Sequence, residues 1–244
     1  MDNGPDIGPG WIRRPLLGFD TETTGVDVTG DRVVTAALVH RVPGVSTEVT
    51  TWLIDPGVEI PQEAAAIHGI TTEHARAHGR QPAEALEEIA AELARHLALG
   101  TPVVAYNAAF DLSLMDHELV RHGLPTLPDR LGHSVGPVLD PLVIDRWKDR
   151  YRSGKRRLGD LSELYGIISD GELHTAEVDV LATLDLLEAL VRRYPELDES
   201  HLVDLHHRQA GAHAAWANGF NDWRTEQGLE GPGASPLWPV QSAS

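Results

Sequence analysis

Residues 19–25, FDTETTG, place two carboxylates, Asp20 and Glu22, directly after an apolar run that begins at Leu16. Side chains spaced i, i+2 in a β-strand point to the same face, so we expect both acids side by side at a strand end. Burial and mutual repulsion disfavour two adjacent negative charges, and a divalent cation between them relieves both effects. An isolated D-x-E is also common on solvated surfaces, so the rest of the chain has to distinguish the two readings.

The segments that follow predict a mixed α/β fold. Short links with Gly and Pro connect three β-branched segments, which favours an antiparallel meander. Its strands are expected at residues 16–20, 31–40 and 48–54, and two further short strands at 102–106 and 138–139. Amphipathic or capped segments predict helices at 61–67, 71–77, 82–99, 109–122, 141–151, 158–165 and 175–193. This order predicts a mixed sheet with helices on its faces.

The two ends of the chain differ in composition from its middle. Residues 1–14 are expected to form a flexible lead, 15–195 the main domain, and 196–244 a helical extension with an irregular Gly/Pro/Ser-rich tail. The histidines of the extension (201, 206, 207 and 213) do not have the spacing of a zinc site, and we expect them to be solvated. Trp216, Phe220 and Trp223 share a helix face that could pack on the main domain. Alternatively, segment 200–228 could contact a polymerase or a second copy of the chain.

Composition excludes several classes of protein. The 37 acidic and 20 basic residues give a net charge of −17, which rules out a non-specific nucleic-acid coater with a broad basic field. The absence of cysteine excludes disulfides, thiolate zinc sites and a cysteine nucleophile. No signal peptide and no apolar run of ~18 residues is visible, so a cytoplasmic protein is expected.

Further acids occur where helices are predicted to begin. Asp111 ends the motif NAAFD at residues 107–111, and Asp179 ends HTAEVD at 174–179. Both fall in the first turns of helices, where the helix dipole tolerates negative charge. Together with Asp20 and Glu22 they can converge at one edge of the sheet.

The order D-x-E, N-x-x-F-D, H-x-A-x-x-D resembles the three exonuclease motifs of the DEDD superfamily, in its histidine-bearing DEDDh subgroup. That subgroup includes the proofreading subunit of bacterial DNA polymerase III, ribonuclease T and oligoribonuclease. The resemblance covers residues 16–190 and includes the spacer IHGIT at 67–71. It implies a ribonuclease-H-like fold with a mixed five-stranded sheet flanked by helices.

The same resemblance implies a 3′→5′ exonuclease that uses two Mg²⁺ or Mn²⁺ ions on DNA or RNA with a free 3′ end and releases nucleoside 5′-monophosphates. It assigns the metal ligands as Asp20, Glu22, Asp111 and Asp179, and the general base as His174. Two-metal catalysis of phosphodiester hydrolysis agrees with four clustered carboxylates. A histidine with an ordinary pKa of about 6.5 can accept a proton near neutral pH. Without metal, we expect the acids to titrate as a coupled set with raised pKa values.

Other residues are candidates for contact with the substrate. The candidates near the motifs are Thr21, Thr23, His68 and Asn107, with helix capping as the alternative role for Asn107 and a loop-turn role for His68. Residues 146–157 hold 7 of the 20 positive charges, and Lys155, Arg156 and Arg157 could guide a phosphate backbone. The alternative is a solvated helix face whose charges pair with nearby aspartates (Asp145, Asp149 and Asp160). Asp140 is interpreted as structural.

Two alternative functions share this fold. One is a proofreading factor that acts mainly by docking to a polymerase, and the other is a catalytically dead nucleic-acid-binding module. All five residues of the expected site are present, which argues against the dead module. DNA and RNA are both retained as substrates, because the contact to a 2′-hydroxyl that separates them has no sequence signature here.

Overall fold

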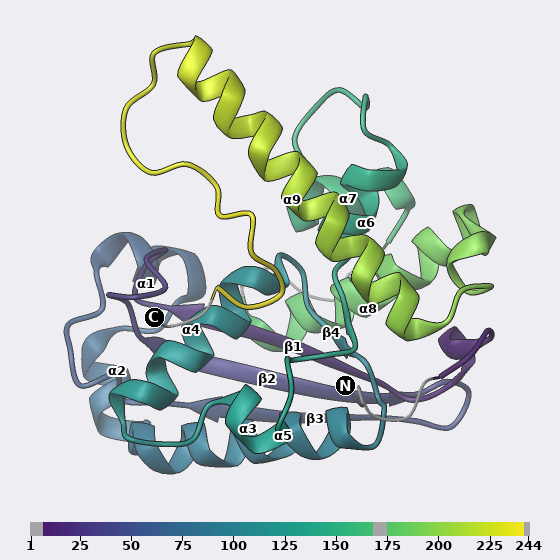
Figure 1. Cartoon of the computed structure of the whole chain (residues 1–244). Helices are drawn as coiled ribbons and strands as arrows, with labels where there is room; N and C mark the ends of the chain where they lie inside the picture. Colours follow the sequence, from purple (N-terminus) through teal and green to yellow (C-terminus); the bar gives the residue numbers. More distant parts are fainter. Residues whose placement is uncertain (1–6, 168–174, 242–244) are drawn as a thin grey trace.

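Five strands form the sheet that the sequence predicts, in the order β3-β2-β1-β4-β5 (Figure 1). The computed structural model describes residues 7–167 and 175–241. The antiparallel meander consists of β1 (Leu16–Thr23), β2 (Val33–Val42) and β3 (Ser46–Leu53). Strand β4 (Val103–Val104) pairs in parallel with β1, and β5 (Val138–Leu139) pairs in parallel with β4. The mixed five-stranded α/β fold is therefore confirmed.

Alternation along the strands divides the core into two layers. Leu17 and Phe19 of β1 face the layer that includes α3 (Pro82–Ala98) and α4 (Ala108–Arg121). Leu16 packs in the other layer, with α8 (Ala176–Arg193). The remaining α-helices of the described residues are α1 (Gln62–His68), α2 (Thr72–His78), α5 (Leu127–Leu131), α6 (Pro141–Lys148), α7 (Leu158–Tyr165) and α9 (Leu202–Glu226). The period of two along a strand thus places odd and even residues of β1 against different helices.

A glycine lets α8 approach β1 closely. A Cβ atom on Gly18 would lie 2.3 Å from Cγ1 of Val180 and 3.1 Å from Cδ1 of Leu184. Any larger residue would push α8 outward, because the contact is already at van der Waals distance without a side chain. Since Asp179 precedes Val180, this contact also sets how near Asp179 lies to the acids at the end of β1.

Asp140 connects the two turns that lead into α4 and α6. One carboxylate oxygen accepts the N–H of Leu142 at 2.9 Å, capping α6. The carboxylate also accepts the backbone N–H groups of Asn107 at 3.1 Å and Ala108 at 2.9 Å. These contacts support the structural role expected for Asp140. Asn107 occupies the N-cap position of α4 with φ 61°, but its side chain makes no capping hydrogen bond. The predicted capping role of this side chain is therefore wrong.

Residues 7–14 are not the flexible lead that composition suggested. They contain a 3₁₀ turn, Trp11–Arg13, in which Trp11 is completely buried. The indole N–H of Trp11 donates to the carbonyl of Leu197 at 3.0 Å. An indole of this size excludes much apolar surface from water when buried, which outweighs the local preference for disorder.

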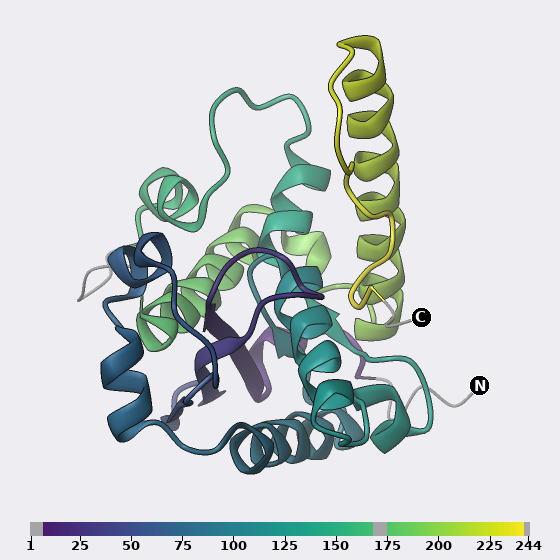
Figure 2. The same cartoon turned by 90° about the vertical axis from the view of Figure 1, so that its left-hand side faces the viewer.

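The C-terminal tail is irregular, as expected, but it folds back along α9 and ends against the core (Figures 1 and 2). Trp238 is buried within the layer that contains α3 and α4, and its indole N–H lies 3.4 Å from Oδ2 of Asp140. The prediction of solvated histidines is wrong for two of them. His206 accepts the N–H of Val138 at 3.1 Å, and His213 donates to the carbonyl of Ser235 at 3.0 Å. The returning tail covers the helix face that carries both histidines.

Within the described parts of the chain, no helix combines the length and the apolar character needed to cross a membrane.

Candidate active site

Three of the four predicted carboxylates meet at one end of β1. One oxygen each from Asp20, Glu22 and Asp179 lies within 4.8 Å of the other two. Asp20 and Glu22 project from the same face of β1, and the pairing register with β2 shifts between Glu22 and Thr23, where the regular ladder ends. Asp179 joins them from the first turn of α8.

Asp111, the fourth carboxylate, is held next to this cluster by Thr21. Oδ1 of Asp111 accepts the Thr21 backbone N–H at 3.0 Å and its hydroxyl at 2.6 Å. Asp111 itself lies in the first turn of α4 and is buried. Because Thr21 uses both donors on Asp111, neither donor is available for the substrate contact predicted from the sequence. Its observed role is to orient Asp111.

Electrostatics confirm the expected direction of titration for three of these acids. Burial, then the charges of Asp111, Glu22 and Asp179, raises the pKa of Asp20 well above its ordinary value. Burial and the charges of Asp179 and Asp111 raise the pKa of Glu22 to about 8. Burial raises the pKa of Asp111 to about 7, although the two hydrogen bonds from Thr21 oppose that shift. The carboxylates therefore repel one another strongly when no cation lies between them.

The donor set fits a hard divalent cation. Mg²⁺ and Mn²⁺ prefer oxygen ligands, and carboxylates that bind them are deprotonated and lose their mutual repulsion. Asp20, Glu22 and Asp179 present their oxygens close enough to share one ion. Asp111 is adjacent and contributes to the high pKa of Asp20. The residues present are therefore suited to the metal ions that the motif pattern predicts.

His174, the predicted general base, lies outside the described residues. The neighbouring Thr175 caps α8, and its hydroxyl oxygen accepts the N–H of Val178 at 3.4 Å. His174 therefore directly precedes the cap of the helix that carries Asp179. Its role stays a prediction from the motif.

His68 ends α1 beside the carboxylates and is buried. Its Nδ1 accepts the N–H of Ile70 at 3.1 Å, so the ring proton is on Nε2, which is buried and interacts with the Thr23 backbone without making a well-formed hydrogen bond. Burial lowers the pKa of His68, which favours the neutral ring. His68 and Glu22 both line a pocket of ≈ 200 Å³ between the sheet edge and the start of α8. A buried donor that is only weakly held and lies next to a pocket is suited to a ligand acceptor, which supports the substrate role over a purely local turn.

Thr23 and Asn107, the two other candidates from the motif segments, differ in whether their side chains are free to contact a ligand. The hydroxyl of Thr23 donates to the Gly25 carbonyl at 2.6 Å and so stabilises the turn after β1. Asn107 holds its backbone in the left-handed region, which asparagine tolerates better than most residues. Its side chain is exposed and makes no capping bond, so it is accessible to a ligand.

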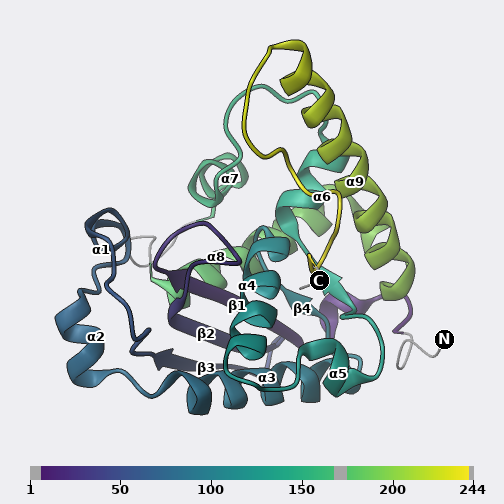
Figure 3. The ribbon, with the colours of Figure 1, turned by 60° about the vertical axis from the view of Figure 1, so that its left-hand side comes forward.

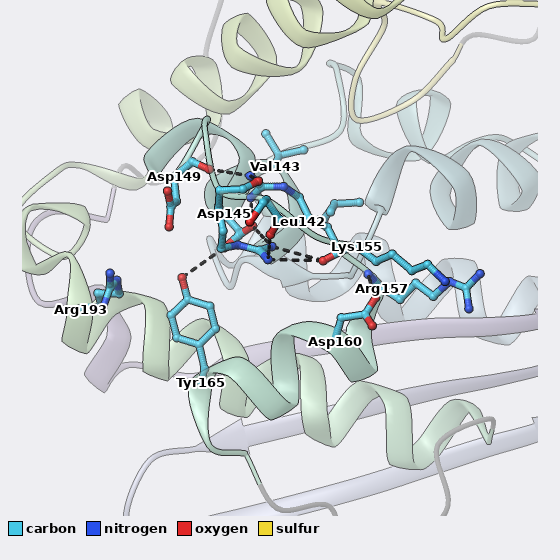
Figure 4. Close-up of polar contacts among 12 residues, drawn as sticks. Leu142, Val143, Asp145, Asp149, Lys155, Arg157, Asp160, Tyr165 and Arg193 are labelled. Carbon is cyan, nitrogen blue, oxygen red and sulfur yellow. Dashed lines mark hydrogen bonds and ion pairs between the residues drawn. The ribbon is translucent and has the colours of Figure 1, made fainter.

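The basic stretch separates into two kinds of residue. Arg152 and Arg156 both pair with the fully buried Asp145, Arg152 at 3.1 Å, and Tyr165 donates its hydroxyl to the same carboxylate at 3.1 Å. Figure 4 shows this network around Asp145, with Lys155 and Arg157 pointing away from it. Both of those side chains are exposed. The alternative reading, pairing with nearby acids, therefore describes Arg156, whereas Lys155 and Arg157 are accessible to phosphate.

Sequence reasoning missed that Thr21 positions Asp111, and that Tyr165 donates to Asp145 beside the linker of residues 149–157 between α6 and α7. Thr21 and Asp111 are 90 positions apart, so no local pattern connects them.

The helix α5 was also missed, although its first residues carry a local sequence pattern that is typical of a helix start. Thr126 and Asp129 form a capping box, in which each side chain bonds to the backbone N–H of the other.

Comparisons with known proteins agree with this geometry. Residues 17–187 match the family described as RNase_T, exonuclease. The chain is 34% identical over 183 residues to a DNA polymerase III subunit epsilon-like protein of Rhodobacter capsulatus, covering 73% of this chain and 23% of that protein. It is 31% identical over 176 residues to the PolC-type DNA polymerase III of Streptococcus thermophilus, covering 71% of this chain and 11% of that protein. The chain thus spans only a small part of these relatives.

Solved structures show the same fold. Exonuclease I of Methylocaldum szegediense superimposes with a TM-score of 0.62 at 26% identity, over 76% of this chain and 42% of that chain. Exonuclease I of E. coli, in complex with a dA16 oligonucleotide, has a TM-score of 0.64 at 22% identity, over 76% and 42%. The family match extends over most of the chain and includes β1, α4 and the first turns of α8, which carry the four carboxylates. The chain belongs to the RNase T-type exonuclease family.

Proposed function

We propose that the chain is a 3′→5′ exonuclease that removes nucleoside 5′-monophosphates from single-stranded nucleic acid with a free 3′ end. The observation that carries this proposal is the convergence of Asp20, Glu22 and Asp179, with Asp111 beside them. Four acids forced together by a strand and two helix starts are destabilising by themselves. Such an arrangement is understandable where the acids have a cationic ligand to bind.

The proposed ligands of two Mg²⁺ or Mn²⁺ ions are Asp20, Glu22, Asp111 and Asp179. When bound, the ions supply positive charge that stabilises the attacking and leaving oxygens of phosphodiester hydrolysis. Thr21 keeps Asp111 in place through its two hydrogen bonds. In this proposal His174 takes the proton of the attacking water, since a histidine is partly neutral at physiological pH.

Three residues around the carboxylates are proposed to hold the 3′ end. Nε2–H of His68 offers a buried donor beside the ≈ 200 Å³ pocket that Glu22 also lines. Asn107 offers an exposed amide at the start of α4. Thr23 contributes through the backbone of the turn it stabilises. Lys155 and Arg157 are proposed to attract the phosphate backbone farther along the strand. The exonuclease I structure with a bound dA16 oligonucleotide supports a single strand as the substrate class.

Proofreading in association with a polymerase is the second candidate function. It is favoured by the similarity of the chain to two relatives, a PolC-type DNA polymerase III and a DNA polymerase III subunit epsilon-like protein. Both functions use the same carboxylates. They differ in whether the chain degrades a free single strand by itself.

A direct assay tests the proposed function. Purified protein is incubated with 5′-labelled single-stranded DNA and RNA in Mg²⁺ or Mn²⁺, beside the Asp20→Asn and His174→Ala variants. We expect a ladder that shortens from the 3′ end with the unaltered chain and a loss of at least about a hundred-fold in either variant. Asp185→Asn is the matched control, because Asp185 lies on α8 like Asp179 but pairs with Arg41. No ladder with either nucleic acid under both metals would overturn the proposal.

A further inference from the structure

The linker of residues 149–157 is folded around a buried charge. Arg152 donates to the carboxylate of Asp145 at 3.1 Å, and Arg156 donates to the same oxygen. The guanidinium of Arg152 also donates to the carbonyl of Lys155 at 3.4 Å, which closes the linker on itself. Because a buried carboxylate strongly resists the loss of its partners, these contacts hold the linker in one shape.

Two further contacts tie the linker to the helices that carry carboxylates. The hydroxyl of Tyr106 donates to the carbonyl of Arg156, and Tyr106 directly precedes Asn107 at the start of α4. After the linker, α7 begins at Leu158 and packs on α8 (Figure 3). The first turns of α4 and α8 hold two of the four acids of the site. The C-terminal end of the linker is therefore connected to both of these helices.

The outer turn of the linker presents an aromatic ring to solvent. Tyr151 is 91% exposed. It lies in a turn that the backbone N–H of Arg152 closes by donating to the carbonyl of Asp149 at 3.2 Å. The guanidinium of Arg150 lies 5.7 Å from the centre of the Tyr151 ring. A flat accessible ring and a cation thus stand side by side on a linker of fixed shape.

The local charge around the linker is positive. Residues 145–160 hold seven basic and three acidic residues. Two of the acids are already engaged, one as the buried partner of two arginines and Asp160 as the acceptor of the Arg157 backbone N–H at 2.9 Å. Arg150, Lys155 and Arg157 are exposed and form no ion pair with the described residues. Salt screens charges farther away than about 10 Å, so this local excess counts for more here than the net −17 of the chain.

We propose that Tyr151 stacks on an unpaired base of the substrate, upstream of the 3′ end at the carboxylates, while Arg150 and Lys155 contact the adjoining phosphates. Aromatic rings stack on bases of any sequence, and neighbouring cations bind the backbone. A base inside a duplex is already stacked and paired, so this contact selects a single strand over a duplex. The inference rests on the proposed function, because it takes the substrate of that site as the ligand.

The setting of Tyr151 favours this role over that of an ordinary surface residue. A single exposed ring needs no ligand by itself. Tyr151, however, lies beside unpaired cations, on a linker that is bonded to the residue preceding Asn107. The fixed shape of the linker also lowers the entropic cost of binding a strand.

The test compares two probes, one with bases and one without. All proteins carry Asp20→Asn to suppress hydrolysis, and fluorescence anisotropy in Mg²⁺ follows binding. The first probe is an oligothymidine of about ten nucleotides, within the range of single-strand sites. The second has the same length and the same 3′-terminal nucleotides, but abasic sugars upstream. We expect Tyr151→Ala to weaken binding of the first probe about ten-fold and to leave binding of the second unchanged, because only bases stack. Tyr151→Phe should keep the affinity, whereas Tyr151→Leu should not.

Leu164→Ala is the matched control, because Leu164 is 53% exposed on the neighbouring α7, and it should bind both probes like the parent protein. Thermal unfolding checks that each variant is folded. The stacking site is refuted if the parent protein binds both probes equally, or if Tyr151→Ala loses affinity for neither probe or for both alike. Full affinity of Tyr151→Leu also refutes it. The proposed function fails separately, through a lack of hydrolysis by the unaltered chain.

Discussion

Asp20 and Glu22 link the stability of the fold to metal binding. The pKa of Glu22 is raised from 4.5 to about 8 by burial and by the charges of Asp179 and Asp111. The folded protein therefore binds more protons than the unfolded chain between these two values. By linkage, the free energy of unfolding falls as the pH rises through that interval, and a bound cation removes the effect.

This linkage predicts opposite responses with and without metal. In EDTA, we expect the melting temperature to fall as the pH is raised from about 6.5 to about 8. Deprotonation of Glu22 in the folded protein creates a buried charge that Asp179 and Asp111 repel, whereas the unfolded chain loses the same proton without this cost. His96 and His206 do not obscure this window, since burial lowers their pKa to about 4 and their contribution lies below it. Mn²⁺ or Mg²⁺ should raise the melting temperature most at the upper end.

Differential scanning fluorimetry across this range provides the measurement. Glu22→Gln is the control, and it should flatten the pH dependence in EDTA and weaken the response to metal. A melting temperature that rises with pH in EDTA would contradict the raised pKa of Glu22.

The linker between α6 and α7 shows how one element divides its charges between structure and binding. Asp145 is fully buried and receives Arg152, Arg156 and the hydroxyl of Tyr165. Leaving a buried carboxylate with fewer partners is strongly unfavourable. Lys155 and Arg157 make no such contact, and the linker presents them to solvent (Figure 4).

Neutralising the two groups should therefore give different results. The double change Lys155→Gln with Arg157→Gln is expected to weaken binding of a single strand and to reduce its logarithmic salt slope by about 1.4, with no change in melting temperature. Arg156→Gln should lower the melting temperature instead, because Asp145 loses a partner. The measurement is anisotropy over a range of salt concentrations, beside thermal unfolding. An unchanged salt slope in the double variant would remove the linker from the binding surface.

At the level of the whole molecule, the returning tail closes the core. Trp238 is 8% exposed, lies 5.0 Å from the ring of His206, and reaches Asp140 at 3.4 Å. The backbone N–H of Gln241 donates to the hydroxyl of Ser113 at 2.8 Å, which fixes the tail against α4. The last residues described thus stabilise the turn that positions α4 and, through it, Asp111.

Removing the indole of Trp238 tests this role. Trp238→Ala is expected to lower the free energy of unfolding by about 3–5 kcal/mol, as large-to-small changes of buried aromatic residues do. Leu237→Ala provides the comparison, because Leu237 is 53% exposed and its removal should change stability by less than about 0.5 kcal/mol. Chemical denaturation measures both values. Equal stability of the two variants would show that the tail is not part of the cooperative fold.

Much of the fold and the carboxylate site follows from short-range patterns. Spacing of i, i+2 places Asp20 and Glu22 on one face, and the helix starts place Asp111 and Asp179, because strand and helix periods are properties of the local backbone. The apolar alternation and the short links indicated the meander. The motif order was enough to predict the family, which the match over residues 17–187 shows.

Contacts between distant residues required the tertiary structure. Thr21 meets Asp111 across 90 positions, and Trp238 meets Asp140 across 98. Trp11, His206 and His213 were expected to be mobile or solvated, yet segments remote in sequence cover them. The physical reason is that periodicity reports only which side of an element is apolar. Which partner covers that side, and which acid receives a given arginine, depends on how the whole chain packs.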